Sequence, residues 1–445
     1  MKKARFISSI PLALLLSLYG VSLSIYAVFS FSQTDPNLVL LNWSPYWQFQ
    51  LWMWETFFKN PVLTAWSYGV LLSVLFSLYL LIIQKLERSS IEYEVGWKKG
   101  ILIYGLLLSP LLLSYNALSH DVFNYIFNAK MVVQYHANPH IQVALDFSND
   151  PWTRFMHNTH TPAPYWYGWT AISLIPYLMG LGKFILTWIS FRIWSLISIV
   201  LLYFVMQYAA QIFTGHKLQT YQLASVFLNP LFMIEIISNM HNDLWMVGPA
   251  ALALAVVTSL DPQHIPQAKK LSLSIVLLLA SISIKLATAV LIPLLISIVV
   301  EKNFLFSIAD MLAVKLPFFK ILPAKLLHSL ESYIYRYIPI VAAGLLFLPL
   351  LTTRSQQFHP WYWTWVLVWL PFIESKLMRN CIIIFSISSM LRYLPWLWTG
   401  GFEGDVLLYQ KMITWVPVVL YLVWKFFPWS IVQGHQDNSE SLLRR

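Results

Sequence analysis

Long apolar runs separated by short polar segments dominate the chain. The runs lie at 8–31, 61–84, 100–118, 166–181, 183–213, 219–238, 243–260, 271–301, 334–352, 361–375, 381–397 and 406–428. Several of them approach or exceed the roughly 20 apolar residues that an α-helix needs to cross a bilayer. Because only helices and closed barrels can span lipid, the pattern predicts an all-α polytopic membrane protein with roughly 11–14 transmembrane helices.

Composition points to the same class. Hydrophobic residues make up 58% of the 445 residues and charged residues 11%, whereas a soluble domain has about 25% charged residues. Many of the 21 tryptophans lie beside the apolar runs, which is typical of aromatic belts at a membrane surface. The lone cysteine, Cys381, excludes an intramolecular disulfide and a cysteine-based metal site.

Basic residues predict how the chain is oriented. Lys2, Lys3 and Arg5 place the N-terminus in the cytoplasm, and the +10 net charge is explained by cytoplasmic loops. No basic, aromatic-interleaved motif for binding nucleic acid is present. Counting crossings from the N-terminus, we expect Asp121 to emerge on the outer face.

Two segments cannot be simple crossings under this orientation. The run 271–301 begins and ends inside, so we expect a hairpin of two short helices that turns near Lys285. The region 166–238 holds three apolar segments but must make an even number of crossings. The segment 166–181, rich in Pro, Tyr and Trp, can lie in the interface instead of crossing, and this would place 241–243 on the same face as Asp121.

The most informative polar stretch begins at Ser119 and follows the run 100–118. An acidic residue at the mouth of an apolar run is costly unless it faces water or has a function. If the following residues are helical, Asp121, Asn124, Tyr125 and Asn128 share one face. This arrangement favours a general base at the membrane surface, although a solvated loop start after a transmembrane helix accounts for the pattern equally well.

Four polar interruptions fall on the predicted outer face. The first is the wet segment 119–165, which holds His120, His136, His140, His157 and His160 together with Asp121, Asp146 and Asp150. The second is His241-Asn242-Asp243. The third is Lys285, either at a hairpin tip that holds a phosphate or extending to the interface. The fourth is His359-Pro360-Trp361-Tyr362, where His359 binds a phosphate, transfers a proton or simply belongs to an aromatic belt.

Histidines and carboxylates also ligate divalent metals, so a metal site in 119–165 is conceivable. No pair in this segment has the spacing of a known metal motif. We therefore expect no metal and no other cofactor.

The order of these motifs resembles the GT-C superfamily of integral-membrane glycosyltransferases. The residues that carry the resemblance are Asp121, Tyr125, Asn138-Pro139, the stretch 161–168, Asn229-Pro230, His241-Asn242-Asp243, Lys285 with Pro293, and His359-Pro360-Trp361-Tyr362. They look most like the bacterial mannosyltransferases that use polyprenol-phosphate-mannose. The resemblance covers about 98 to 375. The sequence departs from the pattern at His140, where an aromatic residue is usual, and in lacking a Pro-Pro pair within 161–168.

The resemblance implies a fold, a reaction and a division of the chain. It implies a GT-C-like catalytic module at 98–375 with an external loop at 119–165, preceded by transmembrane helices in 1–97 and followed by further helices and a short cytoplasmic tail in 376–445. It implies transfer of a hexose, with mannose favoured, from a polyprenyl-phosphate-sugar donor to a lipid-linked or glycan acceptor. The site would lie on the outer face of a multi-pass protein of the bacterial inner membrane.

The resemblance also implies roles for single residues. Asp121 would be the general base of an inverting displacement. Lys285 and His359 would stabilise the departing lipid phosphate, and His241, Asn242 and Asp243 would orient the donor or acceptor. Further substrate-binding candidates are His120, Asn124, Tyr125, Asn138 and Tyr362.

Two other classes fit part of the pattern. A lipid or polysaccharide transporter or flippase also places charges at broken helices, but the chain shows no inverted repeat. A polymerase or ligase of O-antigen type would use arginines in large outer loops, where Arg154 is the main example. Convergence of Asp121, Asp243, Lys285 and His359 in space would favour the glycosyltransferase.

Overall fold

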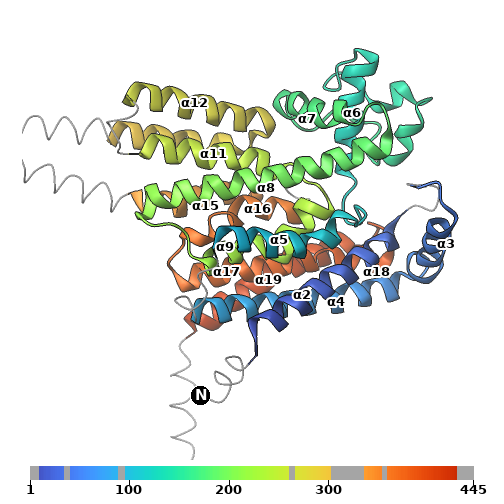
Figure 1. The fold of residues 1–445 in the computed structure, drawn as a ribbon, viewed down its shortest axis with the longest axis horizontal. Coiled ribbons are helices and arrows are strands. Elements are labelled where there is room, and N and C mark those ends of the chain that lie inside the picture. Colours follow the sequence, from blue (N-terminus) through green and yellow to red (C-terminus); the bar gives the residue numbers. More distant parts are fainter. Residues whose placement is uncertain are drawn as a thin grey trace, which may run out of the picture.

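The computed structural model describes residues 10–34, 41–88, 96–259, 266–301, 335–352 and 358–427. All regular structure in these ranges is helical (Figure 1). Within the described ranges, six helices are long and apolar enough to cross a membrane: α2 with η1 (Leu12–Gln33), α4 (Pro61–Arg88), α8 (Phe184–Thr214), α12 (Gln267–Ile284), α17 with α18 (Lys376–Thr399) and α19 (Val406–Phe426). The prediction of an all-α polytopic membrane protein is confirmed.

Other predicted crossings are shorter helices. They include α5 (Trp97–Leu112), α11 (Asp243–Thr258), a helix at Leu286–Glu301 that begins with the turn η6 (Leu286–Leu291), and α15 (Ile338–Phe347) with η8 (Leu348–Leu351). The predicted crossing at 361–375 is wrong. This segment forms the short turns η10 (Pro360–Trp363), α16 (Thr364–Leu367) and η11 (Leu370–Phe372), because each proline removes a backbone donor and interrupts the helix. The expected total of 11–14 crossings remains a prediction.

Several shorter helices gather at one end of the bundle. In Figure 1, α3 (Ser44–Met53), α6 (Asp121–Tyr135) and α7 (Tyr167–Met179) lie at the same end as the start of α8. With 13 residues, α7 is too short to span a bilayer. It therefore fits the expected interfacial segment, and an even number of crossings between 166 and 238 stays a prediction.

The helix α6 begins at Asp121, so the condition under which Asp121, Asn124 and Tyr125 share one face is met. His120 precedes it as N-cap, so the carboxylate lies in the first turn, where the helix dipole favours a negative charge. The start of the segment 119–165 is less exposed to solvent than expected, because Asn124, Tyr125 and Asn128 are all buried.

An ion pair fixes the loop that follows α6. Lys130 Nζ lies 2.5 Å from Asp150 Oδ2, and Tyr135 donates a hydrogen bond of 2.7 Å to the same carboxylate. The loop contains the short turns η3 (Ala144–Phe147) and η4 (Pro151–Phe155). These contacts hold the loop against α6.

A broken helix crosses the core. It consists of α9 (Thr220–Phe227), α10 (Pro230–Met233) and the π-helical turn η5 (Ile234–Ser238), and it bends by 54°. The break is explained by Asn229, whose side chain caps α10 by accepting from Leu231 N at 3.0 Å, and by Pro230 at the first helical position. Arg192 on α8 supports the far end of η5, donating to Ser114 Oγ at 3.2 Å and to the Ser238 carbonyl at 3.4 Å.

The predicted hairpin at 271–301 is present. Helix α12 ends at Ile284, Lys285 has an extended backbone with φ −143° and ψ 130°, and η6 follows at once. Leu271 at the start of one arm and Val299 at the end of the other line a common apolar cavity, as do Ile282 and Ile292 near the turn. The two arms are therefore antiparallel, and Lys285 lies at the tip.

The N-terminal helices are tied to the broken helix. Tyr19 on α2 donates to the Leu228 carbonyl at 2.6 Å, and Tyr79 on α4 donates to the Ser225 carbonyl at 2.7 Å. Both bonds are buried. These helices therefore support the segment that carries residues 235–243, while the proposed division of the chain at residue 97 stays a prediction.

Candidate active site

Asp121 lies at the centre of a group of polar side chains from four parts of the chain. Its Oδ2 atom accepts a hydrogen bond of 2.6 Å from Tyr165 and lies 3.7 Å from Nδ1 of His241. Burial, followed by the nearby Asp121 charge, raises the pKa of Tyr165 well above its usual range, so this phenol remains a donor. The side chain of Asp121 keeps 18% of its surface exposed, which leaves it accessible to a substrate.

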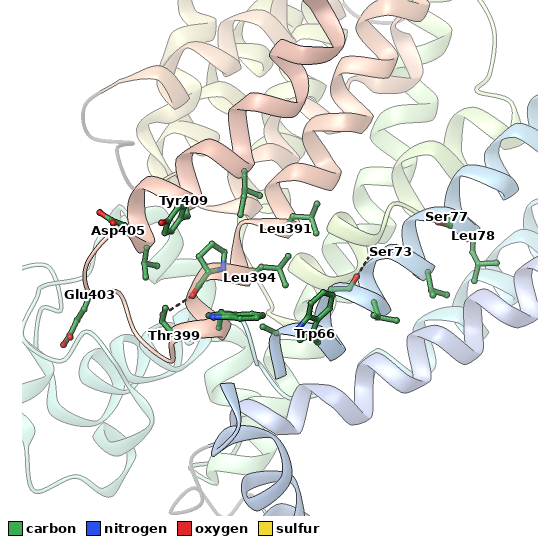
Figure 2. Close-up of a pocket in the computed structure, with 18 residues that line it drawn as sticks. Trp66, Ser73, Ser77, Leu78, Leu391, Leu394, Thr399, Glu403, Asp405 and Tyr409 are labelled. Atoms are coloured by element: carbon green, nitrogen blue, oxygen red, sulfur yellow. Dashed lines mark hydrogen bonds between the residues drawn. The ribbon is translucent and has the colours of Figure 1, made fainter. Parts of the chain in front are cut away.

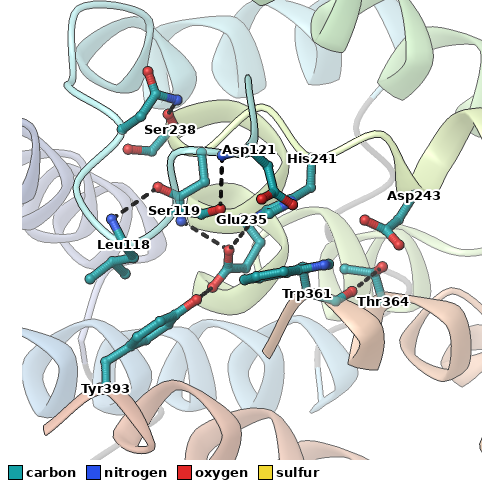
Figure 3. Close-up of polar contacts among 12 residues, drawn as sticks. Leu118, Ser119, Asp121, Glu235, Ser238, His241, Asp243, Trp361, Thr364 and Tyr393 are labelled. Carbon is teal, nitrogen blue, oxygen red and sulfur yellow. Dashed lines mark hydrogen bonds and ion pairs between the residues drawn. The ribbon is translucent and has the colours of Figure 1, made fainter. Parts of the chain in front are cut away.

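His241 lies between two carboxylates. Its Nε2 atom is 3.4 Å from Oε2 of Glu235, and both side chains are fully buried. Figure 3 shows Asp121 and Glu235 on either side of this imidazole, with Trp361 stacked against it. The segment 241–243 therefore lies on the same side of the molecule as Asp121.

Lys285 and Asp243 form a buried ion pair next to Asp121. Lys285 Nζ is 2.7 Å from Asp243 Oδ1, and the same oxygen accepts a hydrogen bond from the Trp365 indole. The ammonium also lies 4.8 Å from the centre of the Tyr165 ring, a distance at which cations attract aromatic faces. Since Tyr165 bonds to Asp121, this ring links the ion pair to the carboxylate.

His359 and Tyr362 border the same region. The rings of His359 and His241 both stack on Trp361, with centroid distances of 4.3 and 3.8 Å. Burial, with smaller contributions from nearby positive groups, lowers the pKa of His359 to about 4. At neutral pH, His359 can therefore form hydrogen bonds but carries no charge. Tyr362 lies 5.8 Å from Lys285 Nζ, measured to its ring centre.

The structure thus brings Asp121, His241, Asp243, Lys285, His359 and Tyr362 together, as the sequence analysis expected. Tyr125 joins them, because its ring lies 5.3 Å from that of Tyr165. We refer to Asp121, Tyr165, Glu235, His241, Asp243 and Lys285 as the polar cluster.

Four other candidates have different surroundings. His120 stacks on His157 at 3.8 Å, and Asn138 bonds to the His140 amide and to Tyr167. Asn124 is buried, and its Oδ1 atom has no hydrogen-bond partner among the described residues; the same holds for both polar side-chain atoms of Asn242. The substrate-binding roles of these four residues remain predictions.

The site residues predicted from the sequence did not include Glu235 or Tyr165. Glu235 interrupts an apolar run, and an ionisable residue within a membrane segment is a signal of function. Tyr165 lies in the 161–168 stretch that contributed to the resemblance, but no spacing rule links it to Asp121. The described residues contain no group of three or more His, Cys, Asp or Glu side chains close enough to hold a metal ion.

A large cavity lies outside the polar cluster. It measures about 1040 Å³ and is bordered by α4, α18 and the start of α19. Figure 2 shows Trp66, Leu391 and Leu394 on its apolar walls and the carboxylates Glu403 and Asp405 at one end. The lining suits a hydrocarbon chain, whereas the two carboxylates would repel a phosphate.

A comparison with known protein families assigns the chain to one of them. Residues 20–301 match the family model of the alpha-(1→6)-mannopyranosyltransferases (MptA/B), N-terminal domain. The chain belongs to this family. The match covers more than half of the chain and contains every residue of the polar cluster. It begins within α2, and so includes helices that the resemblance had left outside the catalytic module.

Membership of this family identifies the protein as a membrane glycosyltransferase of the mannosyltransferase type. It agrees with the resemblance to GT-C enzymes, and it implies a sugar donor, a glycan acceptor and the lipid bilayer as partners. No curated protein and no solved structure matches the chain.

Proposed function

We propose that the protein transfers mannose from a polyprenyl-phosphate-mannose donor to a lipid-linked or glycan acceptor on the outer face of the bacterial inner membrane. The description of its family favours a 6-hydroxyl group as the acceptor. The observation that carries the proposal is the position of Asp121. It is partly exposed at the start of α6 and lies next to a hydrogen-bond donor and a buried ion pair.

Asp121 acts as general base in this proposal. The acceptor oxygen attacks the anomeric carbon while its proton passes to the carboxylate, and the bond from that carbon to the phosphate oxygen breaks. One displacement inverts the anomeric centre. The Tyr165 hydrogen bond orients the carboxylate, which lies in the first turn of α6.

The departing polyprenyl phosphate gains negative charge as the bond breaks. Lys285 is the lysine of the polar cluster, and its ammonium can donate three hydrogen bonds. One of them goes to Asp243. The remaining donors can bind the phosphate. His359 contributes hydrogen bonds and no charge, since its pKa is lowered to about 4. Because Lys285 and hydrogen bonds from His359 can stabilise the leaving group, we propose transfer without a metal. Activity that persists after chelation of divalent ions would support this.

Replacement of the base tests the proposal as a whole. Asp121→Asn keeps the size of the side chain but removes its basicity, so turnover should fall about 10²–10⁴-fold while the protein inserts and accumulates normally. The assay measures transfer of labelled mannose from a short-chain polyprenyl-phosphate-mannose to octyl α-mannoside by the purified protein. Asp146→Asn, which changes an exposed carboxylate of the same segment, is the matched control. Near-normal transfer by Asp121→Asn would remove Asp121 as the base.

A further inference from the structure

Glu235 is a carboxylate enclosed within the protein. It has no exposed surface. Its Oε1 atom accepts a hydrogen bond of 2.9 Å from Tyr393, and its Oε2 atom accepts one of 2.9 Å from Asn239. Figure 3 shows Tyr393 reaching Glu235 from the opposite side to His241. A buried carboxylate with two donors on its own oxygens is held in a fixed orientation.

The backbone around Glu235 is irregular. The residue lies in the π-helical turn η5, and such turns are frequent at functional sites. Met240, which precedes His241, is buried and has a φ of +57°, a conformation that costs about 1–3 kcal/mol for a residue other than glycine. The His241 amide donates to the Glu235 carbonyl at 3.1 Å. The strained turn thus directs the His241 side chain back toward the Glu235 carboxylate.

His241 lies between two carboxylates without a hydrogen bond to either. Nε2 is 3.4 Å from Glu235 Oε2 and Nδ1 is 3.7 Å from Asp121 Oδ2, and neither ring nitrogen has a hydrogen-bond partner among the described residues. A neutral imidazole with its proton on Nε2 would direct that proton toward Glu235 and the Nδ1 lone pair toward Asp121. His359, which shares the Trp361 surface, is a further titratable group near His241.

We propose that Glu235 is a positioning residue for proton transfer, and that His241 receives the proton that Asp121 takes from the acceptor. This inference deepens the proposed function and rests on it. The acceptor O–H bond breaks, and the proton moves to Asp121 Oδ2 and from there to Nδ1 of His241. The electron pair of the cleaved bond leaves on the lipid phosphate. The Glu235 carboxylate stabilises the resulting imidazolium, and Asp121 is returned to its ionised form.

The arrangement predicts a specific pH dependence. Acid lowers kcat/KM when His241 is protonated before the reaction and can no longer accept. A nearby negative charge favours the protonated imidazole. In Glu235→Gln, which keeps the side-chain size, the acidic limb of the profile should therefore move to lower pH by about one unit or more. Turnover on the plateau should fall about 10²-fold.

A matched variant separates positioning from packing. Tyr393→Phe removes one hydrogen bond to Glu235 but keeps its charge, so the acidic limb should stay at its wild-type position. Glu235→Asp, which restores the charge, should return the limb toward the wild-type pH. Profiles are measured with the short-chain polyprenyl-phosphate-mannose and octyl α-mannoside. If Glu235→Gln loses turnover with an unmoved limb, Glu235 has only a structural role and the inference is overturned.

Two further variants complete the test. If Glu235→Gln does not accumulate, His241→Gln decides. Without the imidazole, the acidic limb should move from its wild-type position and report the protonation of Asp121 alone; an unmoved limb would overturn the inference. Asp121→Asn is assayed in parallel. If it is inactive while Glu235→Gln has the wild-type profile, the proposed function stands and the positioning role fails. If Asp121→Asn transfers mannose normally, Asp121 is not the base and the proton relay to His241 fails with it; absence of transfer by the wild-type protein would overturn the proposed function itself.

Discussion

Lys285 Nζ lies 2.7 Å from Asp243 Oδ1, and both side chains are almost completely buried. This contact joins the tip of the 271–301 hairpin to the first residue of α11. Removing one partner of a buried pair leaves an uncompensated charge, whereas removing both is often tolerated. The pair therefore has a structural role, in addition to the phosphate-binding role that we propose for Lys285.

A comparison of single and double variants distinguishes these two roles. Lys285→Met should lower stability by about 3–5 kcal/mol, because Asp243 is left unpaired, and should weaken donor binding. Lys285→Met with Asp243→Asn should recover much of the stability but not the donor affinity. Thermal unfolding in detergent and the KM for the donor measure the two effects. A double variant with wild-type donor KM would show that the lysine is structural only.

The low pKa of His359 predicts a contribution to acid sensitivity. Burial lowers this pKa from 6.5 to about 4, so the unfolded chain binds a proton at a pH where the folded chain does not. Stability from this group is complete above pH 6.5 and is lost as the pH falls toward 4. His359→Gln should therefore show a smaller drop in Tm between pH 6.5 and 4.5 than wild type. His216→Gln, at an exposed histidine, should leave the drop unchanged; an equal drop in both variants would contradict the assignment.

Part of this site could be predicted from sequence. The spacing of polar residues after Asp121 predicted that they share one face if the segment is helical. The basic residues beyond both ends of the run 271–301 predicted a hairpin that turns near Lys285. Neither inference needs contacts between distant parts of the chain. Glu235 was not predicted as a site residue because its partners depend on tertiary structure. The π-helical turn brings His241 close to it, and Tyr393 comes from a helix that is distant in sequence. No periodicity in the sequence encodes that turn.

The crossing expected at 361–375 failed for a related reason. Hydropathy predicts that a segment is buried, but it does not distinguish burial in lipid from burial within the protein. In this segment Trp363, Trp365 and Trp369 are packed within the protein, and the prolines at 360 and 371 divide the chain into short turns.

Gly168 is predicted to control the position of Lys285. A Cβ atom at this residue would lie 2.7 Å from the backbone carbonyl of Ser283, closer than such atoms approach. Gly168→Ala should therefore separate α7 from the end of α12 and displace Lys285, reducing turnover and costing about 1–3 kcal/mol of stability. Gly105→Ala, on a helix with no heavy atom within 4 Å of the added carbon, should retain both. Equal turnover and stability in these two variants would contradict the prediction.

The side of the membrane that carries the polar cluster can be determined with single cysteines. Cys381 is the only native cysteine, so Cys381→Ser provides a background without thiols. Asn239 lies close to the site, but it is fully buried and donates to Glu235; a thiol there would report burial instead of sidedness. Ile141 is the better position, since it is 73% exposed and belongs to the segment that packs beside α6.

His216 gives the matched position on the opposite side. It is exposed and follows the end of α8, a helix of 31 residues that is about 46 Å long at 1.5 Å per residue. The other end of α8 begins at Phe184, which stacks on Phe155 beside α6. Residues 141 and 216 therefore lie near opposite ends of a helix that is long enough to span the bilayer.

A membrane-impermeant thiol reagent applied to intact cells should label Ile141→Cys, whereas His216→Cys should react only after the membrane is opened. This result is expected because the basic N-terminus directs the start of the chain to the cytoplasm, and α2, α4 and α5 then bring Asp121 to the outer face. The reverse pattern would place the polar cluster on the cytoplasmic side. The donor would then have to be used on the inner leaflet, and the outer-face part of the proposed function would be wrong, although the chemistry assigned to Asp121 would not.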